Sequence, residues 1–434
     1  MKDKTTTSSV PVMQPADWAE QLKRLPAEKA GEILKGFSLE QAAAVLSELP
    51  AHDAADLLEQ FPTDLVASWL NLIPPHRAAD LADSFPASRR QTLLAALAPE
   101  HAVAVTALLR HPSDSAGGIM DNRFIAVQAD RTVEACLAEL RSSPRQLTDD
   151  ILYVYVTDAA QRLVGVVSLR ALVFAPVEQQ LREIMNPDVR FLRVTDDQEE
   201  ISRQLQHYHF LGLPVVDAED RLVGVVKIRD AIRVAESEAT EDMQLMVGLS
   251  GEERIWTPWK QSVKRRLPWL GVNLVTALGA ATVVSVFENT LARWTALMVF
   301  LPLISAVAGN TGNQALTVII RALALGEVAA GDALRVLRKE LAIGLANGFL
   351  LGAAIGLLAF GWKGSLLLGV VTGAAMWMNQ IVGALAGVAV PFGLRRCGVD
   401  PALASSIFVT TVTDVIGFLL FLGLATMALY FFGS

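Results

Sequence analysis

The chain has 434 residues, enough for two to four domains of ordinary size, since most domains contain about 100–200 residues. Apolar residues make up 52% of the chain, charged residues only 19%, and the mean hydropathy is +0.38. These values exclude a disordered chain and argue against an ordinary soluble enzyme. The two cysteines, Cys136 and Cys397, cannot build a disulfide framework, and neither has a Cys or His at metal-ligand spacing.

Charge and hydropathy change sharply near residue 260. Residues 261–434 carry 11 Lys and Arg against 6 Asp and Glu, a net charge of +5, whereas residues 1–260 carry 26 against 39, a net charge of −13. An acidic surface repels nucleic acid and favours cations, although many soluble domains are acidic without such a role. Residues 1–9 are polar and unlike a signal peptide. We therefore expect an acidic cytosolic part, with no nucleic-acid partner, followed by a membrane part.

The first predicted domain, after a disordered tail over residues 1–16, is an all-α superhelical domain over residues 17–125. Prolines recur there every 12 or 13 residues, and apolar residues fall at helical spacing between them. The repeated prolines are Pro50, Pro62, Pro74, Pro86 and Pro99. A packed helical domain without further function explains this pattern equally well.

A second, stronger repeat predicts a duplicated α/β module over residues 126–248. The sequence Arg162-Leu-Val-Gly-Val-Val recurs with an offset of 59 residues at Arg221, each time inside a strand, turn, strand, helix pattern. The pair resembles tandem CBS modules, which commonly bind adenine nucleotides. The signature of that family has a hydroxyl, and three residues later an aspartate, after the glycine turn; the first copy has Ser168 but Ala171, and the second has Lys227 but Asp230.

Each nucleotide site is therefore incomplete by sequence. Tyr155, Phe210 and Asp230 are the candidate contacts for ATP, and the alternative is that all three are ordinary core and surface positions.

A connecting, plug-type helix is predicted over residues 249–266, followed by an α-helical transmembrane pore domain over residues 267–434. Five stretches are long and apolar enough to span a lipid bilayer: residues 267–287, 294–320, 341–362, 365–390 and 402–432. With the N-terminus in the cytosol, ten basic residues of the connections lie inside and only Arg293 and Lys363 lie outside. The chain is thus predicted to be a multi-pass protein of the inner (plasma) membrane, with its C-terminus outside.

Asp414 is the only acidic residue predicted deep inside a span. Counted from residue 402 at about 1.5 Å per residue, it lies roughly 18 Å into the bilayer. No Lys, Arg or His occupies the interior of a span, so the carboxyl group is either protonated and hydrogen-bonded, for example to Thr410, or bound to a cation. The hydroxyl groups of Ser406 and Thr410 supply hard oxygen ligands, which suit Mg²⁺ or Ca²⁺.

The second predicted span contains the polar run Gly309-Asn-Thr-Gly-Asn-Gln, which we expect to interrupt the helix beside a hydrated pore. Asn310 and Asn313 of this run are further candidate ligands. If two protomers place Asp414 around one axis, two carboxylates would match one divalent ion.

The domain order and an ordered set of motifs resemble the MgtE family of magnesium channels from about residue 17 onward. The most specific matches begin at Asp114 (DSAGGIM), Glu238 (EATED), Gly309 (GNTGNQA), Arg395 (RRCGVDP) and Thr411 (TVTD). The resemblance implies a homodimeric, Mg²⁺-selective channel for magnesium uptake, with Asp414 as the principal pore carboxylate. Some members have Asn-Pro where this chain has Ser406-Ile407, so one amide ligand is replaced.

The same resemblance implies gating by intracellular Mg²⁺, which would bridge acidic side chains and hold the pore shut. The candidates are Asp400, Glu236, Glu238, Glu241, Asp242, Glu252 and Glu253. The alternative for any one of these acids, other than Asp400, is a solvated surface position.

Three functional classes remain open at this point. The first is a magnesium channel regulated by its own ion, the second a carrier for Co²⁺, Mn²⁺ or Ni²⁺, and the third a membrane-anchored nucleotide sensor. An enzyme is disfavoured, because the sequence has no Gly-rich phosphate loop, nucleophile elbow or His/carboxylate cluster.

Overall fold

The computed structural model describes residues 13–143, 153–251, 253, 255 and 257–432. The chain divides into two compact units, Met1–Glu236 and Ser237–Ser434, which are described separately below.

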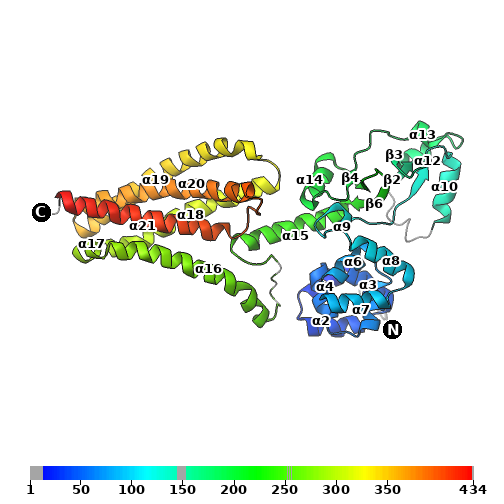
Figure 1. Cartoon of the computed structure of the whole chain (residues 1–434), viewed down its shortest axis with the longest axis horizontal. Coiled ribbons are helices and arrows are strands. Elements are labelled where there is room, and N and C mark those ends of the chain that lie inside the picture. Colours follow the sequence, from blue (N-terminus) through cyan, green and yellow to red (C-terminus); the bar gives the residue numbers. More distant parts are fainter. Residues whose placement is uncertain (1–12, 144–152, 252, 254, 256, 433–434) are drawn as a thin grey trace, which may run out of the picture. The chain divides into compact units, whose positions relative to one another are not determined.

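Unit 1 begins with eight short helices (Figure 1). Five of them follow a proline N-cap, because the fixed φ of proline suits the extended residue before a helix. These prolines are Pro26, Pro50, Pro62, Pro74 and Pro86. The prolines thus mark helix starts, as their spacing predicts. The helices are α1 (Pro15–Lys23), α2 (Ala27–Lys35), α3 (Leu39–Glu48), α4 (Ala51–Leu58), α5 (Thr63–Leu70), α6 (Pro75–Asp83), α7 (Ala87–Ala96) and α8 (Pro99–Leu108).

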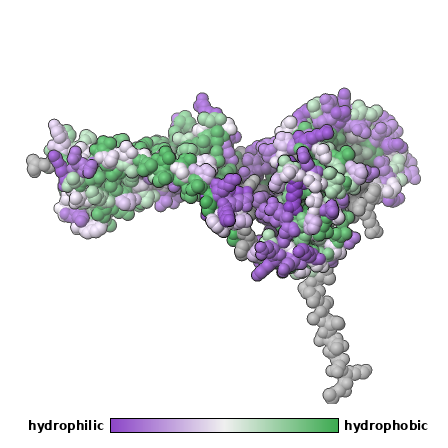
Figure 2. Space-filling model, turned by 60° about the horizontal axis from the view of Figure 1, so that its bottom comes forward, coloured by the Kyte–Doolittle hydropathy of each residue, from purple (hydrophilic) through white to green (hydrophobic). Residues whose placement is uncertain are grey.

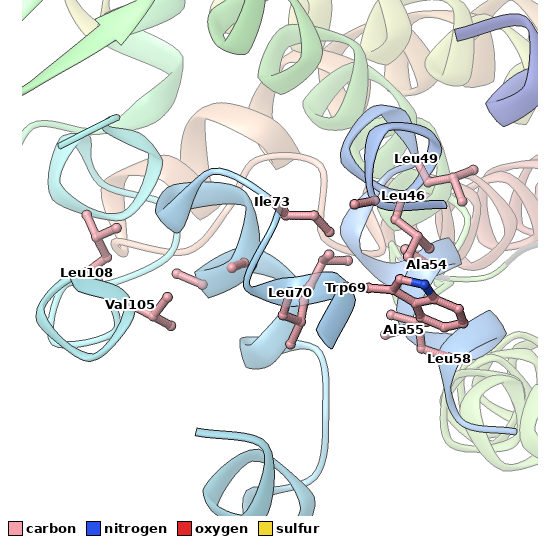
Figure 3. Close-up of a cluster of buried hydrophobic side chains, with 14 of the residues drawn as sticks. Leu46, Leu49, Ala54, Ala55, Leu58, Trp69, Leu70, Ile73, Val105 and Leu108 are labelled. Atoms are coloured by element: carbon pink, nitrogen blue, oxygen red, sulfur yellow. The ribbon is translucent and has the colours of Figure 1, made fainter. Parts of the chain in front are cut away.

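These helices pack in an alternating order, in which each contacts the second helix after it, from α1 with α3 to α6 with α8. The buried side chains come from the apolar stripe of each helix; Figure 3 shows Leu46, Leu58, Trp69 and Leu70 gathered between the helices. Leu46, Leu58 and Leu70 are fully buried. Helices of only 8–10 residues are marginal alone in water, so this shared core stabilises them.

The duplicated modules each contain one three-stranded sheet with a parallel and an antiparallel pair of strands. Strands β2 and β5 and strands β3 and β6 correspond at the offset of 59 residues. A register shift recurs at the same place, after Val156 and after Val215, and so does a left-handed residue, at Gln161 and at Asp220. The structure therefore confirms the duplication down to its irregularities.

The first module comprises β1 (Ala126–Gln128), α10 (Val133–Ser142), β2 (Tyr153–Thr157), β3 (Leu163–Ser168) and α12 (Leu169–Phe174). The second comprises β4 (Leu192–Arg193), α14 (Gln198–Tyr208), β5 (Gly212–Val216), β6 (Leu222–Lys227) and the long α15 (Ile228–Met246). Short helices α9 (Ala116–Ile119) and α13 (Leu181–Ile184) precede the modules.

The two modules exchange their leading segments. Asp121, after α9, forms both backbone hydrogen bonds with Val225 of β6, and Asn186, after α13, forms them with Val166 of β3. The segment before each module thus binds the other module. The second module shares one hydrophobic core with the helical domain, whereas the first module has a core of its own.

Unit 2 is a bundle of long helices, and Figure 2 shows hydrophobic residues over much of its visible surface. Among the described residues, four helices are long and apolar enough to cross a membrane: α16 (Trp259–Val286), α19 (Ala333–Lys363), α20 (Leu366–Arg396) and α21 (Ser405–Phe432). The predicted second span corresponds to α18 (Leu297–Ala324), which has 28 residues but is not one of these four. The short α17 (Glu288–Arg293) and the 3₁₀ turn η1 (Ala330–Asp332) lie between these long helices.

The predicted connecting helix over residues 249–266 is not a separate element. Helix α15 extends to Met246, the described residues 247–251, 253, 255 and 257–258 are not helical, and residues 259–266 form the first turns of α16. Gly248 and Gly251 have φ angles of +76° and +78°, a conformation that favours glycine and ends the preceding helix. The connection therefore consists of the end of α15 and a turn.

Candidate functional site

Asp414 lies on α21, where this helix packs against α18 and α20. Its side chain is half-buried, and its Oδ1 accepts a hydrogen bond from the hydroxyl of Ser305 on α18. No basic side chain in the described part of the chain pairs with it. The structure thus places one carboxylate, with one hydroxyl partner, inside a bundle of apolar helices.

The polar run of α18 is helical throughout, so the predicted interruption of this helix is wrong. Its glycines serve close packing instead. A Cβ on Gly309 would lie 3.5 Å from Oγ1 of Thr413 and 3.6 Å from Cγ2 of Thr410, and one on Gly312 would lie 2.9 Å from the carbonyl oxygen of Gly383. The run therefore brings the α18 backbone against α21 beside Asp414 and against α20.

The other predicted pore residues lie in different surroundings. Thr410 and Ser406 are half-buried, and the hydroxyl of Thr410 donates to the carbonyl oxygens of Ser406, at 2.8 Å, and Ile407. Its oxygen keeps lone pairs for a cation, because only its proton is used. Asn313 is half-buried with an Oδ1 that has no described partner, whereas Asn310 is exposed. The structure therefore gathers Ser305, Thr410 and Asp414, and it leaves Asn310 on the surface of unit 2.

Sequence analysis missed three polar residues of this bundle. Ser305 contacts Asp414 directly, and Asn379 and Gln380 of α20 are fully buried between helices. Thr311 of α18 donates to Oε1 of Gln380 at 2.5 Å. The available signal was two adjacent amides in the middle of an apolar span, where a buried polar group needs a hydrogen-bonding partner.

Acidic residues of the predicted regulatory group lie together only in part. Burial raises the pKa of Asp242 to about 6, and the nearby charges of Asp400 and Glu241 act in the same direction, against Arg321. The side chain of Asp400 is exposed, and its Oδ1 accepts a hydrogen bond from the backbone of Ala402 at 2.7 Å. Among the described residues, no three acidic, His or Cys side chains stand close enough to hold a metal ion.

Glu253 differs from the other predicted regulatory acids. Its buried carboxylate is paired with the guanidinium group of Arg266, and this hydrogen bond lowers the pKa of Glu253. The prediction of a metal ligand at this position conflicts with the pairing, because the protein's own cation already neutralises the carboxylate. Glu238 is half-buried and Glu236 is exposed, and Glu252 lies outside the described residues.

The three candidate nucleotide contacts are largely covered in this structure. Tyr155 is 3% exposed and packs against Leu222 and Val225 of the second module. Phe210 is partly buried against the core of unit 1. Asp230 is 5% exposed, at the start of α15, and its Oδ1 lies 3.9 Å from Nε2 of His76 in the helical domain.

His76 joins Asp230 to a second buried carboxylate. Its Nδ1 lies 3.4 Å from Oδ1 of the fully buried Asp121, which also accepts from Lys227, at 3.0 Å, and Arg123. Burial alone would raise the pKa of Asp121, but the charge of His76 and the hydrogen bonds and charge of Arg123 hold it far below its usual range. The two ring nitrogens of His76 point in opposite directions, so these three side chains do not form one metal site. They hold the helical domain on the second module.

Comparison with known proteins agrees with this architecture. Three family descriptions match: "MgtE intracellular N domain" over residues 13–114, "CBS domain" over residues 116–178 and 181–237, and "Divalent cation transporter" (MgtE) over residues 301–424. The magnesium transporter MgtE of Thermus thermophilus is 39% identical over 351 residues, which are 78% of this chain and 75% of that protein. The chain belongs to the MgtE family.

Other MgtE proteins give the same result. The magnesium transporter MgtE of Bacillus subtilis is 33% identical over 333 residues, covering 77% of this chain and 74% of that protein. Among solved structures, the cytosolic domain of the Mg²⁺ channel MgtE in complex with ATP is similar over 51% of this chain and 91% of that one, with 36% identity and a TM-score of 0.47. The identities with the Thermus and Bacillus transporters confirm the sequence-based identification of the MgtE family.

Proposed function

We propose that this protein is a Mg²⁺-selective channel that mediates magnesium uptake. The observation that carries the proposal is the half-buried carboxylate of Asp414, which has the hydroxyl of Ser305 beside it and no described basic partner. A charge inside an apolar bundle is unfavourable unless it is neutralised, and a divalent ion that keeps part of its water shell is a suitable counterion. Relatives named as magnesium transporters support Mg²⁺ as that ion.

The proposal includes five spans, with α18 as the second. A helix with the polar run of α18 is less apolar than its neighbours, but a position inside the bundle and beside a water-filled path allows it to cross the membrane. The ten basic residues before the first span, between spans 2 and 3, and between spans 4 and 5 then favour cytosolic N-terminal domains and a C-terminus outside.

A homodimer completes the proposed pore. One carboxylate per chain leaves a divalent ion only half neutralised, so a two-fold axis that brings two Asp414 side chains together gives matching charge. The half-buried Asn313, with its Oδ1 free of described partners, and the lone pairs of Thr410 and Ser406 are proposed to bind the water shell of the ion.

Regulation by internal Mg²⁺ is assigned to the acids around the end of α15. Asp242 is repelled by Glu241 and Asp400, as its raised pKa indicates, and a hydrated divalent cation nearby, bound through its water shell, would relieve that repulsion. Glu238 is proposed to belong to the same group. We take the alternating stack of α1–α8 to be superhelical, and we propose that this cytosolic domain takes part in the regulation by Mg²⁺.

We leave nucleotide binding out of the proposal, because Asp230 and Tyr155 are buried by other parts of unit 1. ATP titration by calorimetry tests this choice, and measurable binding heat would restore the CBS pair as a nucleotide site.

The proposal is tested by Mg²⁺ flux into liposomes that contain the purified protein. We expect Asp414→Asn, which removes the charge and keeps the shape, to abolish flux. Glu327→Gln is the matched control, because Glu327 is an exposed acid of unit 2 and its change should leave flux intact. Undiminished flux through Asp414→Asn would exclude Asp414 from the pore, and flux of Co²⁺, Mn²⁺ or Ni²⁺ in preference to Mg²⁺ would favour the second functional class.

A further inference from the structure

Asn379 of α20 is fully buried and contacts the backbone on both sides of the Ser305–Asp414 pair. Its Nδ2 donates to the carbonyl oxygen of Ile304 at 3.2 Å and to the carbonyl oxygen of Thr413 at 3.2 Å. Ile304 immediately precedes Ser305 on α18, and Thr413 immediately precedes Asp414 on α21. One side chain from a third helix thus holds the two backbone positions from which the site residues project.

The orientation of this amide follows from its neighbours. Both contacts are carbonyl oxygens, which only accept hydrogen bonds, so the NH₂ group and not the oxygen of Asn379 must face them. Each carbonyl also belongs to a helix, where one lone pair serves the backbone ladder and a second remains for a side-chain donor. The two hydrogen bonds therefore add to the helices without breaking them.

The packing around Asn379 leaves its side chain little freedom. Gly417 of α21 packs directly against this amide, where an added Cβ would collide with Nδ2 and come within 2.8 Å of Cγ and 3.0 Å of Oδ1 of Asn379. Gly417 is one helical turn from Thr413, so glycine at this position lets α21 approach the amide closely enough for the hydrogen bond. The sequence thus provides both the donor and the space for it.

We infer that Asn379 is a positioning residue for the Mg²⁺ site, which fixes the distance between α18 and α21 and thereby presents Asp414 to the ion. This inference rests on the proposed function. A carboxylate discriminates between ions of different size only if its position is held, because a mobile ligand adapts to a larger ion. Loss of the clamp should therefore weaken Mg²⁺ binding and reduce the preference for Mg²⁺ over the larger Ca²⁺.

The test is Mg²⁺ flux per folded protein in liposomes, measured over a range of Mg²⁺ concentrations and with Ca²⁺ as competitor. We expect Asn379→Leu, which has the same branched shape and no donor, to raise the Mg²⁺ concentration for half-maximal flux about tenfold, the factor that corresponds to the loss of about one neutral hydrogen bond. Competition by Ca²⁺ should become stronger in the same variant. Thr372→Val is the matched control, since Thr372 is a fully buried polar residue of the same helix whose hydroxyl has no described partner.

A second pair of variants keeps the inference testable if Asn379→Leu does not fold. Gly417→Ala pushes against the amide and should shift half-maximal flux in the same direction, whereas Gly423→Ala, on the same helix with open space at its Cβ, should not. A fall in maximal flux with unchanged half-maximal concentration and unchanged competition in Asn379→Leu, or in Gly417→Ala where that variant decides, would overturn the inference. Loss of flux in Asp414→Asn alongside that result leaves the proposed function standing, while undiminished flux in Asp414→Asn overturns both.

Discussion

Asp121, Asp242 and Glu253 are acidic side chains removed from solvent to different degrees, and their neighbours decide what each can do. Asp121 has Lys227 and Arg123 beside it, and Glu253 is paired with Arg266, so the protein itself neutralises both. Asp242 instead faces the charges of Asp400 and Glu241, with only Arg321 in opposition. Among these three, Asp242 is therefore the one for which a cation from outside the chain would be favourable.

The raised pKa of Asp242 predicts a pH-dependent response to Mg²⁺. Its folded-state pKa of about 6 is above the usual value of 3.8, so its surroundings favour the protonated form; the resulting stabilisation is complete below pH 3.8 and is lost as the pH rises through about 6. Above that pH, Mg²⁺ can replace the proton. We expect Mg²⁺ to raise the midpoint of thermal unfolding more at about pH 7.5 than at about pH 5.

Asp242→Asn should remove most of this pH dependence, while Asp188→Asn, at an exposed position, should retain it. An equal effect of Mg²⁺ on the unfolding midpoint of the unmodified protein at both pH values would contradict the prediction.

At the scale of single residues, sequence reasoning found Asp414 because a charge in an apolar span is unfavourable wherever it lies. It could not find Ser305 or Asn379, since serine and asparagine occur in many spans and their role depends on which helix lies opposite. Glu253 shows the reverse error. By sequence it is one acid among several, and only the folded turn after α15 brings Arg266 to it.

At the scale of elements, the CBS pair was predictable because its evidence is a repeat. Equal offsets constrain strands, turns and helices at once, so one alignment of the chain with itself fixes their order. Helix α18 was predicted less well, because two glycines, two asparagines and a threonine lower helix propensity in isolation. In the bundle, Thr311 donates a hydrogen bond to Gln380 and Gly312 contacts the backbone of α20, so tertiary packing overrides the local preference.

Close contact at Gly312 predicts a large difference between two otherwise identical substitutions. In Gly312→Ala the new methyl group would lie 2.9 Å from the carbonyl oxygen of Gly383 and would also meet Val409, so α18 must move away from α20 and α21. We expect a loss of about 1–3 kcal/mol in stability, as is usual for overpacking. Gly271→Ala on α16, with open space around the methyl group, should be neutral or slightly stabilising.

Thermal unfolding of both variants in detergent measures this difference. Equal midpoints for Gly312→Ala and Gly271→Ala would show that the glycine contact between α18 and α20 does not contribute to the packing of the bundle.

At the scale of the whole molecule, the opposite net charges of the two parts were visible in the composition, and so was the membrane part. The boundary between the units could not be predicted, because it lies inside one continuous helix and no change of composition marks it. The structure divides the chain at residue 236, inside α15, so the last turns of this helix, with Glu238, Glu241 and Asp242, belong to the helical bundle. Glu238, Glu241 and Asp242 therefore belong to the same unit as Asp400.

Two deletions separate the acidic group from the rest of the cytosolic part. Removal of residues 1–255 eliminates every proposed regulatory acid except Asp400, so Mg²⁺ flux into liposomes should no longer be suppressed by high Mg²⁺ on the cytosolic side. Removal of residues 1–236 keeps Glu241 and Asp242 with Asp400, and suppression should persist at higher Mg²⁺ concentrations, because the acids remain while unit 1 is lost. Suppression that survives the longer deletion would place the Mg²⁺ sensor within residues 256–434. Complete loss of suppression in the shorter deletion would instead assign the sensor to the acids of unit 1. This unit still has a net negative charge after Asp121 is neutralised by Lys227 and Arg123.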